Sequence, residues 1–162
     1  MKILSSSLET SILGLDYIQL CFFEKNKETI MGTFKTLEEA KEFFKDDGFA
    51  SANGVVLEEL DDTHSVSSLV LTERHKNAMG GVMGGAIFTL ADFAFATLSN
   101  QLHRGTVAQQ VSINYLGAPK GGKLIARAVC RKNGRSSCIV NVDVVDDTGK
   151  DIAQFVGTGF KL

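Results

Sequence analysis

The longest helical pattern of the chain lies in its middle. Its apolar residues recur with the three- and four-residue spacing of one helix face: Ile87, Leu90, Ala91, Ala94, Phe95 and Leu98. Gly84-Gly85 precedes this run, and the pattern fades near Asn100. The sequence therefore predicts a long helix that is apolar on most of its surface and is buried inside the fold.

Most of the other segments alternate between apolar and polar residues with the two-residue period of strands. Six strands are predicted, at residues 54–60, 64–71, 107–115, 123–132, 136–146 and 152–161. Asn133-Gly134 predicts a type I′ turn between two of them. Runs of strands before and after one long helix predict an α+β fold with an antiparallel sheet.

The first part of the chain carries a weaker pattern. Thr36 and Glu39 have the spacing of a capping box, which predicts a short amphipathic helix over residues 36–46. Residues 1–30 are expected to form an N-terminal extension of unknown role. Residues 31–162 are expected to form one domain, with its core at 48–162.

Composition excludes several classes of protein. With a net charge of −2, the chain lacks the basic excess of a nucleic-acid binder. The three cysteines are odd in number and have no CxxC spacing, and the three histidines have no metal-ligand spacing. We expect no metal, no cofactor and no disulfide framework, a cytoplasmic location, and histidines at the surface or in loops.

The apolar run from Gly80 to Leu98 is close to the length of a membrane span, but Asp92 stands near its middle. A carboxylate at the bilayer centre is costly, so the run is expected to be a buried helix of a protein that does not bind the membrane. Asp92 is also the only formal charge between Lys76 and Arg104. Two interpretations are open. Asp92 is either a structural residue that caps a loop or pairs with a basic side chain, or it is a catalytic carboxylate in a dry cleft.

Features of the helix favour the catalytic interpretation. Gly85, Thr89, Ala96 and Ser99 are small or polar and are expected near the Asp92 face, where they leave room for a ligand or a partner subunit. The first amides of the helix, at Gly84 and Gly85, have no intrahelical partner and can polarise a carbonyl oxygen. Asp92 lies eight residues further on, about 12 Å along the axis. A site shared across a dimer would bring the two groups together.

The string Asn77-x-x-Gly80-x-x-Met83-Gly84-Gly85, followed by Thr89-Leu90-x-Asp92, resembles the phenylacetate-pathway (PaaI-type) group of hotdog thioesterases. That group shows N-x-x-G-x-x-H-G-G and then T-L-x-D at the same spacing. The resemblance extends over residues 48–162. It implies a hotdog fold, in which an antiparallel sheet wraps a long helix, and a homodimer or homotetramer with shared active sites.

The resemblance also implies roles for single residues in hydrolysis of an acyl-CoA thioester. Asp92 corresponds to the catalytic carboxylate, as general base or nucleophile, and Gly84 to the glycine whose amide polarises the thioester carbonyl. Asn77 corresponds to the asparagine that the facing subunit supplies. Met83 stands where the group has a histidine, and Ala108 where some relatives have a serine near the carboxylate; a thioether lacks the histidine's donor.

The remaining substrate contacts are expected from Gly85, Thr89 and the basic hairpin of Arg131, Lys132 and Arg135. These three charges would meet the CoA phosphates, or they form a solvated turn. Two other functions stay open for the whole chain. One is an acyl-CoA-binding module without turnover, and the other is a hotdog dehydratase or hydratase, for which Met83 removes the obvious histidine.

Overall fold

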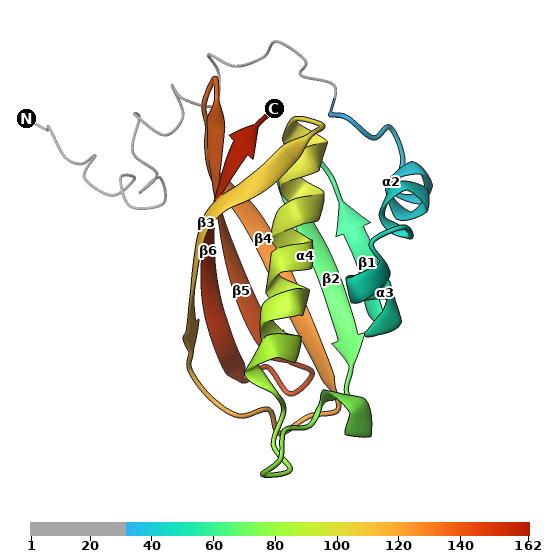
Figure 1. Cartoon of the computed structure of the whole chain (residues 1–162), viewed down its shortest axis with the longest axis vertical. Helices are drawn as coiled ribbons and strands as arrows, with labels where there is room; N and C mark the ends of the chain where they lie inside the picture. The colour runs from blue at the N-terminus through green and yellow to red at the C-terminus, as the bar shows by residue number, and fades with distance from the viewer. Residues whose placement is uncertain (1–31) are drawn as a thin grey trace, which may run out of the picture. The chain divides into compact units, whose positions relative to one another are not determined.

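The computed structural model describes residues 32–162, and the expected extension at residues 1–30 lies outside them. Within these residues, two short helices, six strands, one 3-10 turn (η1) and one long helix follow one another. Figure 1 shows the arrangement of the helices and strands. Their order is α2 (Leu37–Phe44), α3 (Gly48–Ala52), β1 (Val55–Leu60), β2 (His64–Val70), η1 (Glu73–His75), α4 (Gly84–Leu102), β3 (Thr106–Tyr115), β4 (Lys123–Asn133), β5 (Ser137–Asp146) and β6 (Asp151–Lys161). The predicted long helix and all six predicted strands are present, so the α+β prediction is confirmed.

The six strands form one antiparallel sheet in the order β1-β2-β4-β5-β6-β3. The sheet curves around α4, which contacts every strand and lies along one face (Figure 1). The short helices α2 and α3 lie beside β1 at one edge, and β3 forms the other edge. This is the wrapped-helix arrangement that the resemblance implied.

The core lies between α4 and the inner face of the sheet. Alternate residues of β5, namely Cys138, Val140, Val142 and Val144, are at most 1% exposed. Phe95 of α4 meets Phe155 of β6 with ring centroids 6.0 Å apart. A long helix can approach the sheet this closely because β6 carries glycines beneath it: a Cβ on Gly157 would lie 2.5 Å from the Phe95 ring.

Two local predictions are wrong. Gly134 does not take the positive φ that a type I′ turn requires; its amide donates to the Ser137 carbonyl oxygen at 2.8 Å, so the chain reverses at Arg135 and Ser136. The regular alternation expected for residues 107–115 is also interrupted. A bulge between Ala108 and Gln110 puts Ala108 opposite Gly159 on the helix-facing side of the sheet.

The short helices begin at side-chain caps. The Thr36 hydroxyl accepts from the Glu39 amide at 3.1 Å, as the capping box predicts, but the Glu39 carboxylate reaches the Lys35 amide instead of Thr36. The predicted helix ends at Phe44, and a second short helix, α3, follows; Asp47 caps it by accepting from the Ala50 amide at 3.2 Å.

Asp146 organises the loops at the end of the sheet near Gly84. Its side chain is 1% exposed and accepts from the Thr148 hydroxyl and from the amides of Lys120, Gly121, Thr148 and Lys150. These bonds, led by the Thr148 hydroxyl, hold the pKa of Asp146 well below its usual range. The carboxylate thereby fixes the chain reversals that follow β3 and β5.

Within residues 32–162, no helix is both long enough and apolar enough to cross a membrane. The same part of the chain contains no cluster of three or more His, Cys, Asp or Glu side chains that could hold a metal ion. Cys130 and Cys138 are free thiols whose pKa is raised by burial, whereas Cys21 lies outside the described residues.

We predict that Gly157→Ala destabilises the protein by about 1–3 kcal/mol, because the new methyl group would overlap the buried Phe95 ring. Urea denaturation measures the change. Gly122→Ala is the matched control, since Gly122 is exposed and a Cβ there meets nothing within 4 Å. Equal stability of the Gly157 variant and wild type would contradict the close packing of α4 on β6.

Candidate active site

One stripe of α4 is not covered by the sheet. Gly85 is exposed, and Thr89, Asp92 and Ala96 are half-buried. Their spacing of four, three and four residues puts them on one line along the helix. Ser99 was expected on this line, but it is fully buried, and its hydroxyl donates to the Ala96 carbonyl oxygen at 3.1 Å. The open stripe is therefore shorter than predicted, with Asp92 near its centre.

The Asp92 carboxylate has no partner within the described residues. It accepts no hydrogen bond there and pairs with no basic side chain, so it neither caps a loop nor forms an ion pair. Burial raises the pKa of Asp92 above its usual value, and the negative charge of Asp47 adds to the effect. A half-buried carboxylate without compensation is costly to the fold, which favours the catalytic interpretation over the structural one.

Asp47 reaches the neighbourhood of Asp92 through α2 and α3. Phe44 at the end of α2 packs edge-on against Phe93, the residue after Asp92, with ring centroids 5.6 Å apart. The next turn, α3, contacts α4 directly, and Asp47 is its cap. The two short helices therefore form one flank of the Asp92 stripe and contribute a second negative charge.

The N-terminus of α4 offers free donors. Met83 is its N-cap but makes no side-chain cap hydrogen bond. Within the described chain, the amides of Gly84 and Gly85 donate to no acceptor. The Thr89 hydroxyl is already used, since it donates to the Gly85 carbonyl oxygen at 2.8 Å. Two adjacent amides at the positive end of a 19-residue helix form a ready site for a carbonyl oxygen or an anion.

The loop before this helix end is closed by backbone hydrogen bonds between its two sides. The Met83 amide donates to the His75 carbonyl oxygen at 2.7 Å, and Lys76 pairs with Val82. His75 was expected at the surface or in a loop, but it is only 5% exposed. Its Nδ1 accepts from the Thr72 amide at 3.0 Å, which leaves Nε2–H to donate to the Asn53 carbonyl oxygen at 2.9 Å. These two bonds explain the burial of the ring and anchor the loop to the domain.

Asn77 lies on this loop and is exposed. Its Oδ1 accepts from the amides of Met79 and Gly81 at 2.9 and 3.2 Å. Gly80, with φ of 80°, completes the tight turn, and its amide donates to the Asn77 carbonyl oxygen at 2.9 Å. The side-chain oxygen is thus committed to the loop, and the Nδ2 group is the part of Asn77 that is left to act outward.

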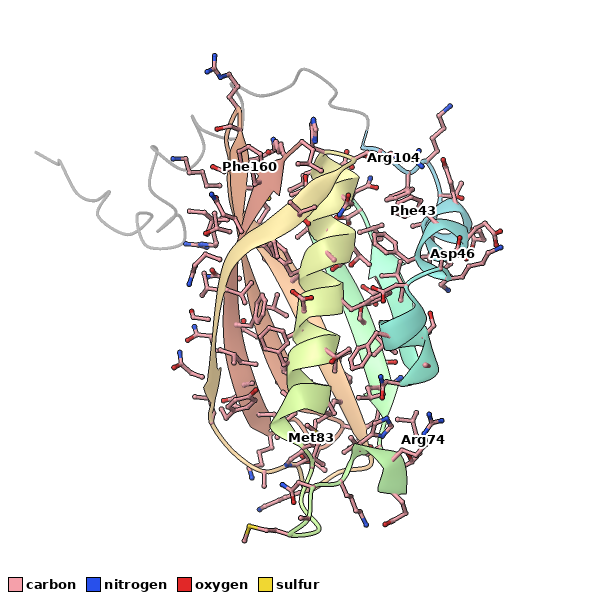
Figure 2. All side chains as sticks on the ribbon, in the orientation of Figure 1. Phe43, Asp46, Arg74, Met83, Arg104 and Phe160 are labelled. Atoms are coloured by element: carbon pink, nitrogen blue, oxygen red, sulfur yellow. The ribbon has the colours of Figure 1, made fainter. Side chains whose placement is uncertain are left out.

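Met83 covers the free amide end from one side. Its side chain is 53% exposed, and its Cε lies 3.1 Å from where a Cβ on Gly85 would be. Figure 2 shows Met83 at the start of α4, at the opposite end of the molecule from Arg104 and Phe43. The thioether therefore stands beside the free donors but cannot donate a hydrogen bond itself.

Tyr115, the last residue of β3, reaches the same helix end. Its hydroxyl donates to the Gly84 carbonyl oxygen at 3.0 Å. A Cβ on Gly84 would lie 3.2 Å from both Cζ and Oη of Tyr115, so glycine is what lets the phenol ring come this close. The edge strand is thus tied to the first turn of α4.

The expected CoA-binding hairpin lies near the C-terminal end of α4, whereas Gly84 is at the N-terminal end of this helix. Arg131, Lys132 and Arg135 are exposed. Ser137 pairs with Phe160, and Thr106, which follows the C-terminus of α4, pairs with Lys161 beside it. A strand as long as β3 spans about 30 Å, so one chain does not bring these charges to its own Gly84.

Comparison with known proteins identifies the family. Residues 79–153 match the Thioesterase superfamily. Acyl-coenzyme A thioesterase PaaI of Escherichia coli K12 is 27% identical over 129 residues, which cover 79% of this chain and 92% of PaaI. The structure of E. coli PaaI matches with a TM-score of 0.72 over 76% of this chain and 90% of that chain.

A mutant of the phenylacetic acid degradation protein PaaI of Thermus thermophilus is 32% identical, with a TM-score of 0.68 over 72% of this chain and 100% of that chain. The chain belongs to the thioesterase superfamily. A hypothetical thioesterase of Streptococcus pneumoniae TIGR4, solved with coenzyme A, is 30% identical, with a TM-score of 0.67 over 72% of this chain and 94% of that chain. These matches confirm two predictions: the hotdog fold and the resemblance to PaaI-type thioesterases.

Three residues lie near the candidate site although the sequence did not place them there. His75 lies in a loop pattern that gives no sign of burial. Asp47 directly follows the helix predicted over residues 36–46, although an Asp before Gly48-Phe49-Ala50 is also the signal for a new helix start. Tyr115 continues the inner face of β3 after Val111 and Ile113, and its position at the strand end is the available signal.

We predict that Asp92→Asn is at least as stable as wild type at pH 7. Because the pKa of Asp92 is raised in the folded chain, its charged form is less favourable there than in the unfolded chain. The wild type therefore loses stability relative to Asp92→Asn as the pH rises above about 4, the usual carboxyl pKa. Urea denaturation at pH 4 and pH 7 measures this.

Asp146→Asn is the control of opposite sign. The pKa of Asp146 is lowered, so its charged form stabilises the folded chain above the usual carboxyl pKa, and the variant should lose stability at pH 7. A large loss of stability in Asp92→Asn at pH 7 would show that Asp92 has a structural partner.

Proposed function

We propose that this chain hydrolyses an acyl-CoA thioester to a free acid and coenzyme A. The observation that carries the proposal is the unpaired, half-buried carboxylate of Asp92 on the open stripe of α4. Two comparisons support it: E. coli PaaI is named an acyl-coenzyme A thioesterase, and the S. pneumoniae thioesterase was solved with coenzyme A. The free thiols Cys130 and Cys138 fit a cytoplasmic enzyme.

Asp92 acts in its deprotonated form in either of two routes. As a general base, it takes a proton from water while the water oxygen attacks the thioester carbon. As a nucleophile, its own oxygen attacks and forms a mixed anhydride, which water then hydrolyses. In both routes the C–S bond breaks, and the CoA thiolate leaves and takes up a proton.

The helix N-terminus stabilises the charge that develops on the thioester oxygen. The Gly84 amide is the proposed donor, and the dipole of α4 adds partial positive charge at this point. Removing one such donor typically lowers kcat by about 100- to 1000-fold in acyl-transfer enzymes. Thr89, Gly85 and Met83 would line the same site, where Met83 offers only apolar contact.

We infer that the active site is shared between two subunits. Within one chain, Asp92 lies about 12 Å along α4 from Gly84, too far for both to meet one thioester group. The edge strand β3 is exposed over most of its length and pairs only with β6 among the described strands. Antiparallel pairing of two β3 edges would extend the sheet across a dimer.

The same pairing would solve the problem of the distant hairpin. An antiparallel β3 pair places the two α4 helices in opposite directions. The partner's basic hairpin would then lie near the Gly84 end of the first subunit, and the partner's Gly84 end would lie near the first subunit's hairpin. Arg131, Lys132 and Arg135 of one subunit could bind CoA phosphates at the site of the other, and Asn77 could contribute its Nδ2 group across the interface. Such dimers can pair again into a tetramer.

We predict that Asp92→Asn lowers thioester turnover by at least about 1000-fold, since loss of a catalytic carboxylate typically costs about 10,000-fold. Thiol release from short-chain, long-chain and aromatic acyl-CoAs measures the effect, with a substrate-free blank for the protein's own cysteines. Near-wild-type turnover in the variant would exclude Asp92 from catalysis.

Two additional measurements, of acyl-CoA binding and of enoyl-CoA hydration, separate the other two functions. Tight acyl-CoA binding by wild type with no thiol release would identify a binding module without turnover. Addition of water to an enoyl-CoA, followed by ultraviolet absorbance and without thiol release, would identify a hydratase. Either result would replace the thioesterase proposal.

A mixing experiment tests the shared site. Asn77→Asp keeps the oxygen that accepts from the Met79 and Gly81 amides but removes the Nδ2 donor. We expect the Asn77→Asp and Asp92→Asn homodimers each to be impaired. Random mixing should restore about a quarter of wild-type activity, because half of the dimers are mixed and each of these has one intact site. No recovery after subunit exchange would place Asn77 and Asp92 of the same subunit in one site.

A further inference from the structure

Tyr115 makes a hydrogen bond at the N-terminus of α4 that has no role in the reaction steps proposed above. Its hydroxyl donates to the Gly84 carbonyl oxygen at 3.0 Å, across 31 positions of sequence. The backbone on both sides of Tyr115 is fixed: Tyr115 pairs with Ala153, and the next amide, Leu116, donates to the Ile152 carbonyl oxygen at 2.8 Å. The phenol is therefore delivered to the helix end by the rigid sheet.

The Gly84 carbonyl has room for this second donor. In an α-helix, the carbonyl of the first residue accepts from the amide four residues later, here Phe88. A carbonyl oxygen has two acceptor positions, so one remains for the Tyr115 hydroxyl. The side chain thus adds a bond to the first turn and displaces none.

The bond acts on a particular amide. The carbonyl of Gly84 and the N–H of Gly85 belong to one planar peptide group and share its delocalised electrons. A hydrogen bond donated to the carbonyl oxygen withdraws electron density from this group and makes the N–H a stronger donor. The Gly85 amide is one of the two that donate to no acceptor within residues 32–162.

The approach also fixes the orientation of the peptide. Glycine has many backbone conformations available, and two adjacent glycines at a helix start would lose order easily. The Tyr115 ring lies against Gly84: a Cβ added at Gly84 would be only 3.2 Å from Cζ and Oη of Tyr115. Contact and hydrogen bond together hold the Gly84–Gly85 peptide plane with its N–H directed outward.

We propose that Tyr115 is a positioning residue that aligns the Gly84–Gly85 peptide and strengthens the Gly85 amide as a second donor to the thioester oxygen. This inference rests on the proposed function for its substrate. Gly84 and Gly85 then act as a pair of donors, and the edge strand contributes to catalysis through the backbone of α4. In a trans peptide the carbonyl oxygen and the N–H point in opposite directions, so in this proposal Tyr115 acts on the peptide from the side opposite to the thioester oxygen.

Tyr115→Phe tests the proposal because it keeps the ring against Gly84 and removes only the hydroxyl. We expect kcat to fall about five- to tenfold, or about 1–1.4 kcal/mol at 1.36 kcal/mol per factor of ten. The KM for acyl-CoA should change less than twofold, since the bond matters most when charge develops on the thioester oxygen. An unchanged kcat, or a rise in KM alone, would overturn the proposal.

Thr106→Val is the matched control. Thr106 is the first residue of β3, and its hydroxyl donates to the His103 carbonyl oxygen at the other end of α4, at 2.6 Å. This variant loses the same type of bond between the same two elements, at the end of α4 without free amides. We expect its kcat to stay near wild type. An equal fall in both variants would show that loosening of α4 is the cause, and would overturn the proposal.

A second measurement does not depend on turnover. In ¹H–¹⁵N spectra of the whole protein, the Gly85 amide proton should move upfield in Tyr115→Phe, because its peptide group is less polarised while the ring remains in place. The Gly84 amide belongs to the preceding peptide group and should move less. A Gly85 signal unchanged from wild type would overturn the inference even if thioesterase activity is established. The expected shift in a chain without turnover would locate the failure in the proposed function.

Discussion

The packing of α4 into the curved sheet is the constraint on which the other features depend. The helix can lie close to β6 because Gly157 and Gly159 leave room for the Phe95 ring. This contact fixes the rotation of α4 about its own axis. Asp92 is thereby held on the side that the sheet leaves uncovered, and the Gly84 end is held within reach of Tyr115.

The same packing makes Asp92 a costly residue. Half-burial removes part of the water around the carboxylate without giving it a donor within residues 32–162, and Asp47 adds a negative charge nearby. Carboxylates that are partly removed from water usually have a hydrogen-bonding or charged partner, so one without either within the described chain is unusual. A fold selected only for stability would replace it with an uncharged residue. Its presence is the physical reason to place chemistry on this stripe.

The regular periods of the sequence predicted most of the fold. Alternation with a period of two located six strands, and the helical spacing from Ile87 to Leu98 located α4, because burial on one face dictates both patterns. The candidate site residues Asp92 and Gly84 were singled out because an isolated charge and a glycine pair interrupt an apolar run. Local irregularities of the strands and turns were not predicted, because they leave the overall periodicity unchanged. The bulge before Gln110 brought Ala108 to the helix side, and the hairpin reversal moved from Asn133-Gly134 to Arg135-Ser136. Tertiary hydrogen bonds, such as that of Tyr115, leave no periodic signal.

The loop that carries Asn77 has a consequence for the speed and selectivity of binding. The side-chain oxygen of Asn77, the Lys76–Val82 bridge and the buried His75 ring hold this loop in one shape within the folded chain. The conformational entropy of the loop is therefore lost during folding and not at each encounter with a ligand. If the loop borders the proposed site, a rim held in one shape would accept molecules that already match it, and it would discriminate by fit without the delay of a closing lid.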